Sequence, residues 1–510
     1  MRQSHLIISN AVVIWMARLL SLVPQFILVP YLIRTIGEVG YGIYALIWSL
    51  MMSIDQLERS LQSGVVKYCA GFLALGRTSE INSTVSSSLI YSILLAVLGC
   101  GGVLIASVLY DDQTGQVTSA LILVGLLLLF TIPLTPYIAI IQSRQRYYLS
   151  AIVDVISKYI GLAAIFLWFR LVSPSVYALI AIMMVMLLLS RFVQVPMAYK
   201  LVPGLHINPR LFEMKNFRLI ALFGASTVLA SACLALNSTG IRWLMNYLES
   251  TAFVTHLAIT LMPGLLLSYL IGAMVITVMP ATSAYSTTNN QIMLQELMVR
   301  GMRYISVFAL SVLLAFGLTI ESLFSFWVGR EYKFLIPYTL SILTSVAFLE
   351  ITSVSHHMLK GMDRLKVVIY IYFIGLVVVP FASIFAIFWK SGNAYLSVCL
   401  GLVAGNLTTG ILQTIFCAKL VKINLIKLIL QVFIYPFSIA IVVALIAYQV
   451  ELLGAFNHMV SQILVSLLAI ILFLGGCYIL ITSSLEKRWI GNTLEMFSRK
   501  MLSFLASKTD

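Results

Sequence analysis

The sequence predicts an all-α polytopic membrane protein with about fourteen transmembrane helices. Of its 510 residues, 61% are hydrophobic and only 10% are charged, and the mean hydropathy is +1.03. The apolar residues also fall into long runs, and a helix needs about 20 of them to cross a bilayer. A soluble domain cannot bury this much apolar surface, so a multi-pass membrane protein is expected.

The apolar runs, taken in chain order, define the elements. Polar or basic turns separate one run from the next. The expected spans are 6–31, 41–66, 84–109, 117–142, 149–170, 175–198, 218–242, 251–280, 301–328, 336–359, 366–389, 394–418, 428–449 and 458–482. The first run is too long for a cleaved signal peptide and no small-x-small site follows it, so we expect it to remain as the first span.

The basic residues give the orientation of these spans. With a cytoplasmic N-terminus, basic residues are more than three times as frequent at cytoplasmic ends as at the opposite ends. This bias is the positive-inside pattern of membrane proteins. The net charge of +14 is therefore a topology signal, and no nucleic-acid partner is expected. Both termini are expected in the cytoplasm.

Two polar connections divide the chain into six, six and two helices. The first is the proline-containing loop LVPGLHINPRLFEMKNFRL and the second is the basic stretch AKLVKINLIKL. The expected parts are an N-lobe (1–200), an inter-lobe linker (201–217), a C-lobe (218–418), a basic linker (419–427), two further helices (428–482) and a cytoplasmic basic tail (483–510). Six helices in each lobe keep both in one orientation, as a repeat about the membrane normal requires.

Arg18 is the charge that most needs an explanation. It lies near the middle of the first span, where a permanently charged guanidinium costs at least about 2.5–3.5 kcal/mol. The positions three and four residues away hold Ile14, Trp15, Ser21 and Leu22, so its own helix offers no acid. Another helix or a ligand must supply the counter-charge. A cation that lines a cavity suits an anionic substrate, above all a phosphate.

Acidic residues inside the spans are candidates for ion coupling. Helix 2 carries Asp55, Glu58 and Arg59, and Asp55 can pair with Arg59 because they are four residues apart. Glu350 lies about ten residues from either end of its span. Asp55, Glu58 and Glu350 are therefore the candidates for binding a coupling H⁺ or Na⁺. The sequence has no nucleotide-binding or hydrolase motif and no cysteine spacing for a metal, so neither an enzyme nor a cofactor is expected.

The first two helices resemble a known family. LVPYLIRTIGEVGYGIYALIWSL and GVVKYCAGFLALGRTSEINSTVSSSLIYS are similar to the first hairpin and the following loop of Wzx-type polysaccharide flippases. These belong to the multidrug/oligosaccharidyl-lipid/polysaccharide exporter superfamily. Glu58 stands where relatives often carry an aspartate followed by a glycine pair.

The resemblance implies a V-shaped pair of lobes around a cationic central cavity in a bacterial inner membrane. It implies that undecaprenyl-pyrophosphate-linked oligosaccharide, a repeat unit of O-antigen, capsule or exopolysaccharide, is flipped from the cytoplasmic to the periplasmic leaflet by alternating access. Relatives place basic residues on helices 1, 2, 7 and 8, which implies a substrate site with Arg18, Arg59, Arg242 and His256. Gln25 and Asn237 could bind sugar hydroxyls. Membrane lipids, a polysaccharide polymerase and chain-length proteins are the other implied partners.

Two alternatives stay open on the sequence. One is an ion-coupled multidrug antiporter of the same superfamily, which would favour an acidic cavity for cationic substrates. The other is a non-transporting membrane scaffold in envelope polysaccharide assembly, which would tolerate a neutral residue in place of Arg18.

Overall fold

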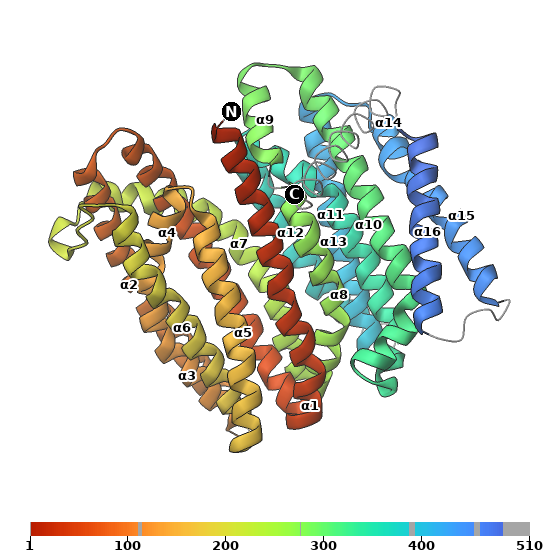
Figure 1. Cartoon of the computed structure of the whole chain (residues 1–510), viewed down its shortest axis with the longest axis horizontal. Coiled ribbons are helices and arrows are strands. Elements are labelled where there is room, and N and C mark those ends of the chain that lie inside the picture. The colour runs from red at the N-terminus through yellow and green to blue at the C-terminus, as the bar shows by residue number, and fades with distance from the viewer. Residues whose placement is uncertain (1, 111–114, 276, 387–392, 453–458, 483–510) are drawn as a thin grey trace, which may run out of the picture.

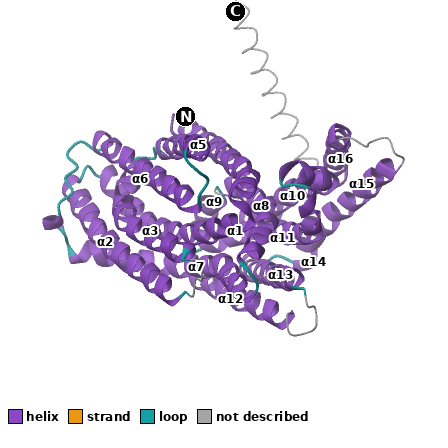
Figure 2. Ribbon diagram, turned by 90° about the horizontal axis from the view of Figure 1, so that it is seen from below, coloured by secondary structure: helices purple, strands orange, loops and turns teal. Residues whose placement is uncertain are grey.

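The computed structural model describes residues 2–110, 115–275, 277–386, 393–452 and 459–482. Some side chains inside the helices also lie outside this description, among them those of Arg18 and Asn237. Every regular element of the described ranges is helical (Figure 2). This agrees with the predicted fold class.

The helices follow one another through short connections. The longer elements are α1 (Arg2–Ala74), α2 (Thr78–Leu109), α3 (Gln116–Thr131), α4 (Thr135–Ser143), α5 (Tyr147–Leu171), α6 (Val176–Leu201), α7 (Met214–Leu248), α8 (Thr251–Val275), α9 (Val278–Thr287), α10 (Gln291–Trp327), α11 (Ile336–Gly361), α12 (Leu365–Ala386), α13 (Ala394–Val421), α15 (Tyr435–Leu452) and α16 (Met459–Leu480). The short elements are η1 (Ile132–Leu134), η2 (Pro209–Leu211), η3 (Arg330–Leu335), α14 (Leu425–Ile429) and the π-helical η5 (Leu430–Ile434).

Twelve helical segments of the described residues are long and apolar enough to cross a membrane, against about fourteen expected. One of them, Leu19–Gln56, runs through the end of the first expected span and the start of the second. At Gly37 its backbone leaves the helical region, with φ 76° and ψ 175°, which glycine adopts readily because it has no Cβ. Helix α7 matches the expected span 218–242 but is not among the twelve, and many of its side chains lie outside the description.

The helices form two groups side by side (Figure 1). Helices α2 to α6 gather on one side and α10 to α16 on the other. Between them α1 packs against α7 and α8, so these three helices form the seam of the molecule. At the far edge α15 and α16 pack against each other and against α10. The six–six–two division remains a prediction.

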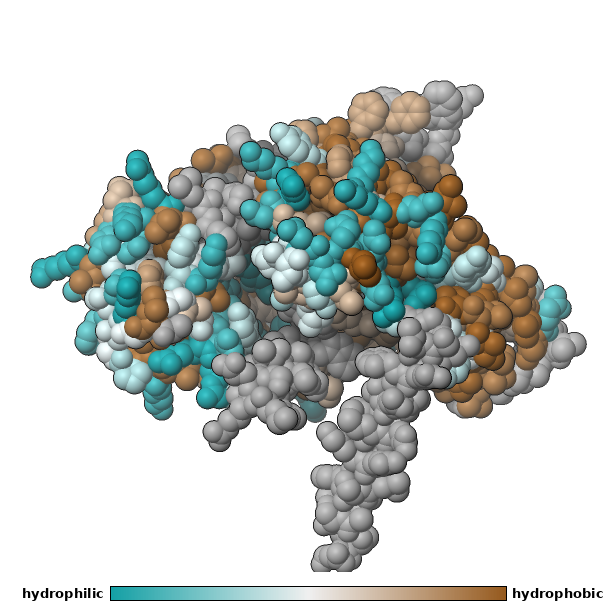
Figure 3. Space-filling model, turned by 90° about the horizontal axis from the view of Figure 1, so that it is seen from above, coloured by the Kyte–Doolittle hydropathy of each residue, from teal (hydrophilic) through white to brown (hydrophobic). Residues whose placement is uncertain are grey.

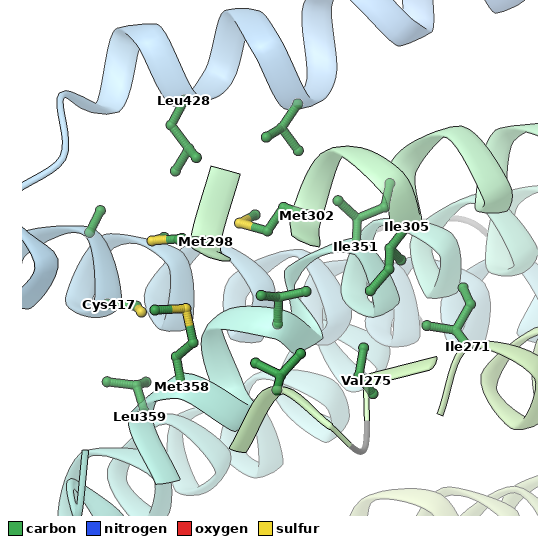
Figure 4. Close-up of a cluster of buried hydrophobic side chains, with 14 of the residues drawn as sticks. Ile271, Val275, Met298, Met302, Ile305, Ile351, Met358, Leu359, Cys417 and Leu428 are labelled. Atoms are coloured by element: carbon green, nitrogen blue, oxygen red, sulfur yellow. The ribbon is translucent and has the colours of Figure 1, made fainter. Parts of the chain in front are cut away.

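The second group is held by an apolar core of long side chains (Figure 4). Met298, Met302 and Ile305 of α10 meet Ile351 and Met358 of α11, all at most 4% exposed. Methionine is flexible and fills irregular gaps between helices. This core fixes the position of α8, which contributes to the candidate site.

Glycines allow the closest helix contact in this group. A Cβ on Gly401 of α13 would fall 1.9 Å from Ser383 Oγ of α12, and one on Gly405 would fall 2.2 Å from Val379 Cγ2. The spacing GLVAG is the small-xxx-small pattern that lets membrane helices approach closely. Across the other face of α13, the Gln413 amide donates to Thr352 Oγ1 of α11 at 2.6 Å.

The two ends of the bundle differ. The basic end, with Arg77, Arg146 and Lys200 at helix termini, is the face seen in Figure 3, where hydrophilic side chains gather while the flank beside α15 and α16 is mostly hydrophobic. The opposite end carries Gly37 and is called the kink end here. An apolar flank between polar ends is the surface that a bilayer requires.

Candidate functional site

A cavity of about 670 Å³ lies on the seam. Both halves of α1 line it, together with α4, α5 and α8. The lining residues are Ala17, Ser21, Leu22, Gln25, Met52, Arg59, Gln62, Ser63, Val66, Lys67, Gln142, Tyr147, Ser150, Ala151, Asp154, Lys158, Ser268 and Tyr269. Lys67 and Tyr147 stand near helix ends at the basic end, so the cavity extends from the middle of the bundle toward that end. We call it the large cavity.

Four charged side chains line the large cavity: Arg59, Lys67, Lys158 and Asp154. Arg59 is an open one, with 69% of its side chain exposed. Its Nη2 lies 2.7 Å from Asp55 Oδ2, and its Nε donates to the same oxygen at 2.8 Å. The expected pair is therefore confirmed. One edge of the guanidinium is held by Asp55, and the exposed remainder is available to an anion in the cavity.

Arg191 of α6 lies close to two acidic side chains of α1, behind the wall of the large cavity. Its Nη2 lies 3.6 Å from Asp55 Oδ1 and 3.4 Å from Glu58 Oε2. The Thr135 hydroxyl donates to the same Glu58 oxygen at 3.1 Å. The side chains of Arg191 and Glu58 are only 13% and 9% exposed, so both charges depend on each other for compensation.

Arg191 is not among the residues that the sequence singles out. A signal for it exists, because it is a lone arginine within the apolar run AIMMVMLLLSRFVQVPM, as Arg18 is in the first span. Charges in such positions almost always face protein or water. On α5, Asp154 interacts through its charge with Arg191, Lys158 and Arg59. The site is thus a mixed-charge network whose cavity-facing members are mainly basic.

Glu350 reaches the large cavity only through another side chain. It lies on α11 close to Ser268 of α8, which is in the cavity wall. The candidate coupling acids therefore flank the cavity from both groups of helices, with Asp55 and Glu58 on one side and Glu350 on the other.

Arg242 and Gln25 line a second, smaller cavity of about 70 Å³. Its wall also contains Tyr41, Tyr44 and Trp48. Gln25 belongs to both cavities, whereas Arg242 is absent from the lining of the large one. The structure therefore separates Arg59 and Arg242, two residues that were expected in one cavity.

His256 lies among aromatic rings at the kink end and lines neither cavity. Its Nδ1 is 2.6 Å from the Tyr395 hydroxyl, and its Nε2 is 3.6 Å from Glu38 Oε1. The same Glu38 oxygen accepts a hydrogen bond from Tyr332 at 2.7 Å. These contacts join the α1 kink to α8, η3 and α13, so His256 lies where the seam helices meet the second helix group.

Further contacts close the seam toward the kink end. Trp327 donates to the Phe26 carbonyl at 2.9 Å, and the two rings stack with centroids 4.7 Å apart. The Ser53 and Thr239 hydroxyls lie 2.5 Å apart, and Thr239 also donates to the Ser49 carbonyl. The large cavity therefore extends away from the kink end, where α1 contacts α7 and α10.

The side chains of Arg18 and Asn237 lie outside the described residues. The backbone of Arg18 is helical, and Ser21 and Leu22, one turn further along α1, both line the large cavity. Among the described residues, no cluster of histidine, cysteine, aspartate or glutamate has the composition of a metal site.

The arrangement is one that can bind a large anion. Arginine offers several donors in one plane, and Lys158 and Lys67 add mobile charges on the same cavity surface. The uncharged donors Gln25, Gln62 and Ser63 suit hydroxyl groups. Many transporters bind their substrates in a cavity between two groups of helices.

Several solved membrane-protein structures have a similar fold. The chain has the fold of the MOP superfamily of membrane transporters. An inward-facing multidrug resistance MATE family transporter matches with a TM-score of 0.68 and 14% identity, over 81% of this chain and 98% of its own. The lipid II flippase MurJ, in an inward closed conformation, matches with a TM-score of 0.67 and 14% identity, over 92% of this chain and 99% of its own.

A MOP superfamily transporter from Pyrococcus furiosus, described as having a binding pocket of reverse polarity, matches with a TM-score of 0.61 and 14% identity, over 81% of this chain and 95% of its own. No family model matches the sequence, and no curated protein sequence matches it either. These solved neighbours are transporters rather than enzymes. At such low identity they define the fold alone.

Proposed function

We propose that the protein flips undecaprenyl-pyrophosphate-linked oligosaccharide from the cytoplasmic to the periplasmic leaflet of a bacterial inner membrane by alternating access. The observation that carries this proposal is Arg59, whose side chain is largely exposed in a polar cavity of about 670 Å³ on the seam. A phosphate on a lipid carrier is the anionic group that such a site suits best.

The cargo's pyrophosphate binds at Arg59, with Lys158 and Lys67 as further cations. Arg18 joins this set, since its turn of α1 borders the cavity. The sugars lie against the amides of Gln25 and Gln62. Asn237, Arg242 and His256, which the family resemblance also implies, act at later stages of transport.

The proposed organisation explains how cargo enters and leaves. Fourteen crossings form two six-helix lobes in a V, divided at the linker 201–217, with helices 13 and 14 added. The basic end faces the cytoplasm, so the large cavity loads there while the kink end is closed. The lipid tail stays in the bilayer, and an apolar groove of about 150 Å³ between α15 and α16 is a surface on which it can lie. A polysaccharide polymerase and chain-length proteins act on the delivered cargo.

Transport is driven by an ion that binds a carboxylate near the cavity. Asp55, Glu58 and Glu350 are the candidates. Asp55 contacts Arg59 directly, so binding of H⁺ or Na⁺ to Asp55 frees the guanidinium for cargo. Glu350 lies beside Ser268, which is in the wall of the same cavity.

A flipping assay in proteoliposomes tests the proposal. The substrate is a fluorescent lipid-linked oligosaccharide whose outward exposure is followed with a membrane-impermeant quencher. Arg59→Gln and Arg18→Gln should each slow flipping at least tenfold, and Arg59→Lys should retain part of the rate because charge remains without the planar fork. Arg170→Gln, at an exposed helix end, is the matched control. Wild-type rates in both Arg59→Gln and Arg18→Gln would refute the proposal.

Multidrug antiport is the second candidate, because Asp154 lines the cavity and MATE transporters share the fold. The same vesicles distinguish the two functions. An antiporter would export a lipophilic cation down an opposing ion gradient and lose that activity in Asp154→Asn, while Arg59→Gln would leave it intact. A non-transporting scaffold would show neither activity.

A further inference from the structure

The 70 Å³ cavity around Arg242 holds a buried positive charge with no visible counter-charge. Within the described residues, Arg242 forms no ion pair or hydrogen bond, and its Nε is fully buried without a partner. Tyr41, whose phenol is neutral, lines the same cavity. An arginine side chain cannot be deprotonated in a protein, and an isolated buried charge is among the costliest features of an interior.

The undescribed side chains of the surrounding helices do not supply an acid. Residues 2–15, Arg18, Leu57, Ser60 and Leu61 of α1, 222–231 and 234–238 of α7 and Ala273 of α8 include no aspartate or glutamate. The protein therefore offers Arg242 no carboxylate from these positions.

The other polar groups of this cavity are donors without described partners. The amide of Gln25, the hydroxyls of Tyr41 and Tyr44 and the indole N–H of Trp48 all belong to lining residues. None of these four side chains hydrogen-bonds to another described residue. Each of these four groups can donate a hydrogen bond, so together with the Arg242 guanidinium they can bind an anion.

The size of the cavity limits what it can hold. A site for one water needs roughly 10–15 Å³ of this kind of volume, so about 70 Å³ admits a small ion with several waters. This is about a tenth of the volume of the large cavity, which is too small for an oligosaccharide. The walls come from α1, α7 and α8, which are the helices of the seam, so an anion here neutralises a charge at the contact between the two helix groups.

We propose that the Arg242 cavity is a site for one small inorganic anion of the size of chloride, separate from the large cavity, which stabilises the closed seam. The inference does not depend on the identity of the cargo. It assigns Arg242 a ligand of its own in this conformation. The anion must leave, or be replaced by an anionic group of the cargo, when the seam opens.

The stability of the purified full-length protein in detergent tests this site. Chloride replaces gluconate at constant ionic strength while the unfolding temperature is followed. The wild type should show a saturable rise of a few degrees, since a ligand that binds only the folded state stabilises it. Arg242→Gln should lose this response, and without chloride it should unfold at or above the wild-type temperature because the uncompensated charge is gone.

Arg59→Gln is the matched control and should keep the full chloride response. Inorganic pyrophosphate gives the reverse test: its stabilisation should be lost in Arg59→Gln and kept in Arg242→Gln. A chloride response that is equal in Arg242→Gln and wild type would overturn the proposal, as would no saturable response in the wild type. Pyrophosphate stabilisation that depends on Arg242 would overturn it too, because the cavity would then belong to the cargo site.

Fluorescence gives a readout that does not depend on stability. Iodide bound beside Trp48 should quench its emission with a saturable component. That component should disappear in Trp48→Phe and in Arg242→Gln, and it should persist in Trp168→Phe, which removes an exposed indole of α5. Quenching that is purely collisional and equal in all variants would contradict an occupied site.

Discussion

The Tyr332 hydroxyl donates a hydrogen bond to Glu38 Oε1 at 2.7 Å, although the two residues are 294 positions apart. Glu38 follows the glycine at which α1 changes direction, and Tyr332 lies in η3 between α10 and α11. The same carboxylate lies beside His256, and the Glu38 carbonyl accepts from Thr255 at 2.6 Å. One residue of the α1 kink thus contacts both α8 and η3.

Removing this bond should open the kink end more often. Tyr332→Phe deletes only the hydroxyl, and a net hydrogen bond contributes about 0.5–1.5 kcal/mol. Glu38 is 41% exposed, which favours the lower half of that range. We expect the ratio of closed to open molecules to fall two- to fivefold, measured by spin-label distances across the kink end. Tyr370→Phe, on an exposed tyrosine of α12, should change nothing.

Gly42 lies where α1 and α8 approach most closely, and a methyl group there should hold them apart. A Cβ on Gly42 would fall 2.1 Å from the Thr251 carbonyl oxygen, which is backbone and cannot turn aside. Overpacking of this kind costs about 1–3 kcal/mol. Gly42→Ala should therefore favour a conformation open at the kink end, seen as faster labelling of a cysteine introduced in the seam.

Gly71 of the same helix is the control for Gly42, since a Cβ there meets nothing within 4 Å. Gly71→Ala should label at the wild-type rate. Equal labelling of the Gly42→Ala and Gly71→Ala proteins would mean that the tight contact does not limit opening.

Arg191 should matter more for stability than any other charge of the site. Arg191→Gln leaves the buried Glu58 without its cation, and breaking a buried pair in this way costs about 3–5 kcal/mol. The denaturation midpoint should fall accordingly. In Arg191→Gln/Glu58→Gln much of the loss should return, because no buried charge is then left alone. A double mutant as unstable as the sum of the single mutants would disprove the coupling.

Asp55 competes with the cargo for Arg59, so removing its charge should tighten anion binding slightly. The pair is largely exposed on the arginine side, and exposed pairs contribute about 0.2–1 kcal/mol. Asp55→Asn should therefore raise the affinity for inorganic pyrophosphate by about two- to fivefold in a calorimetric titration. Glu296→Gln, which breaks the comparable Glu296–Arg300 pair away from the cavity, should leave the affinity unchanged.

The sequence predicts helices well here because each span must satisfy its own backbone and be apolar along its length. It also predicts the Asp55–Arg59 pair, because residues four positions apart lie on the same face of a helix. How different helices are placed decides which residues pair with Arg191 and how far Arg242 lies from Arg59. The spacing of residues along one sequence does not contain this information. His256 illustrates this: its helix was expected at the cavity, but its height along α8 puts it among the rings of the kink end.

Gln25 lies in the wall of both cavities, and its chemistry makes that shared position consequential. Rotation of a carboxamide by half a turn exchanges a donor for an acceptor without moving the backbone. The same side chain can therefore present N–H to an occupant of one chamber and C=O to the other, and then reverse. An occupant of one cavity therefore affects the other cavity through a single torsion angle of Gln25. The substitution Gln25→Met would remove this coupling between the two cavities.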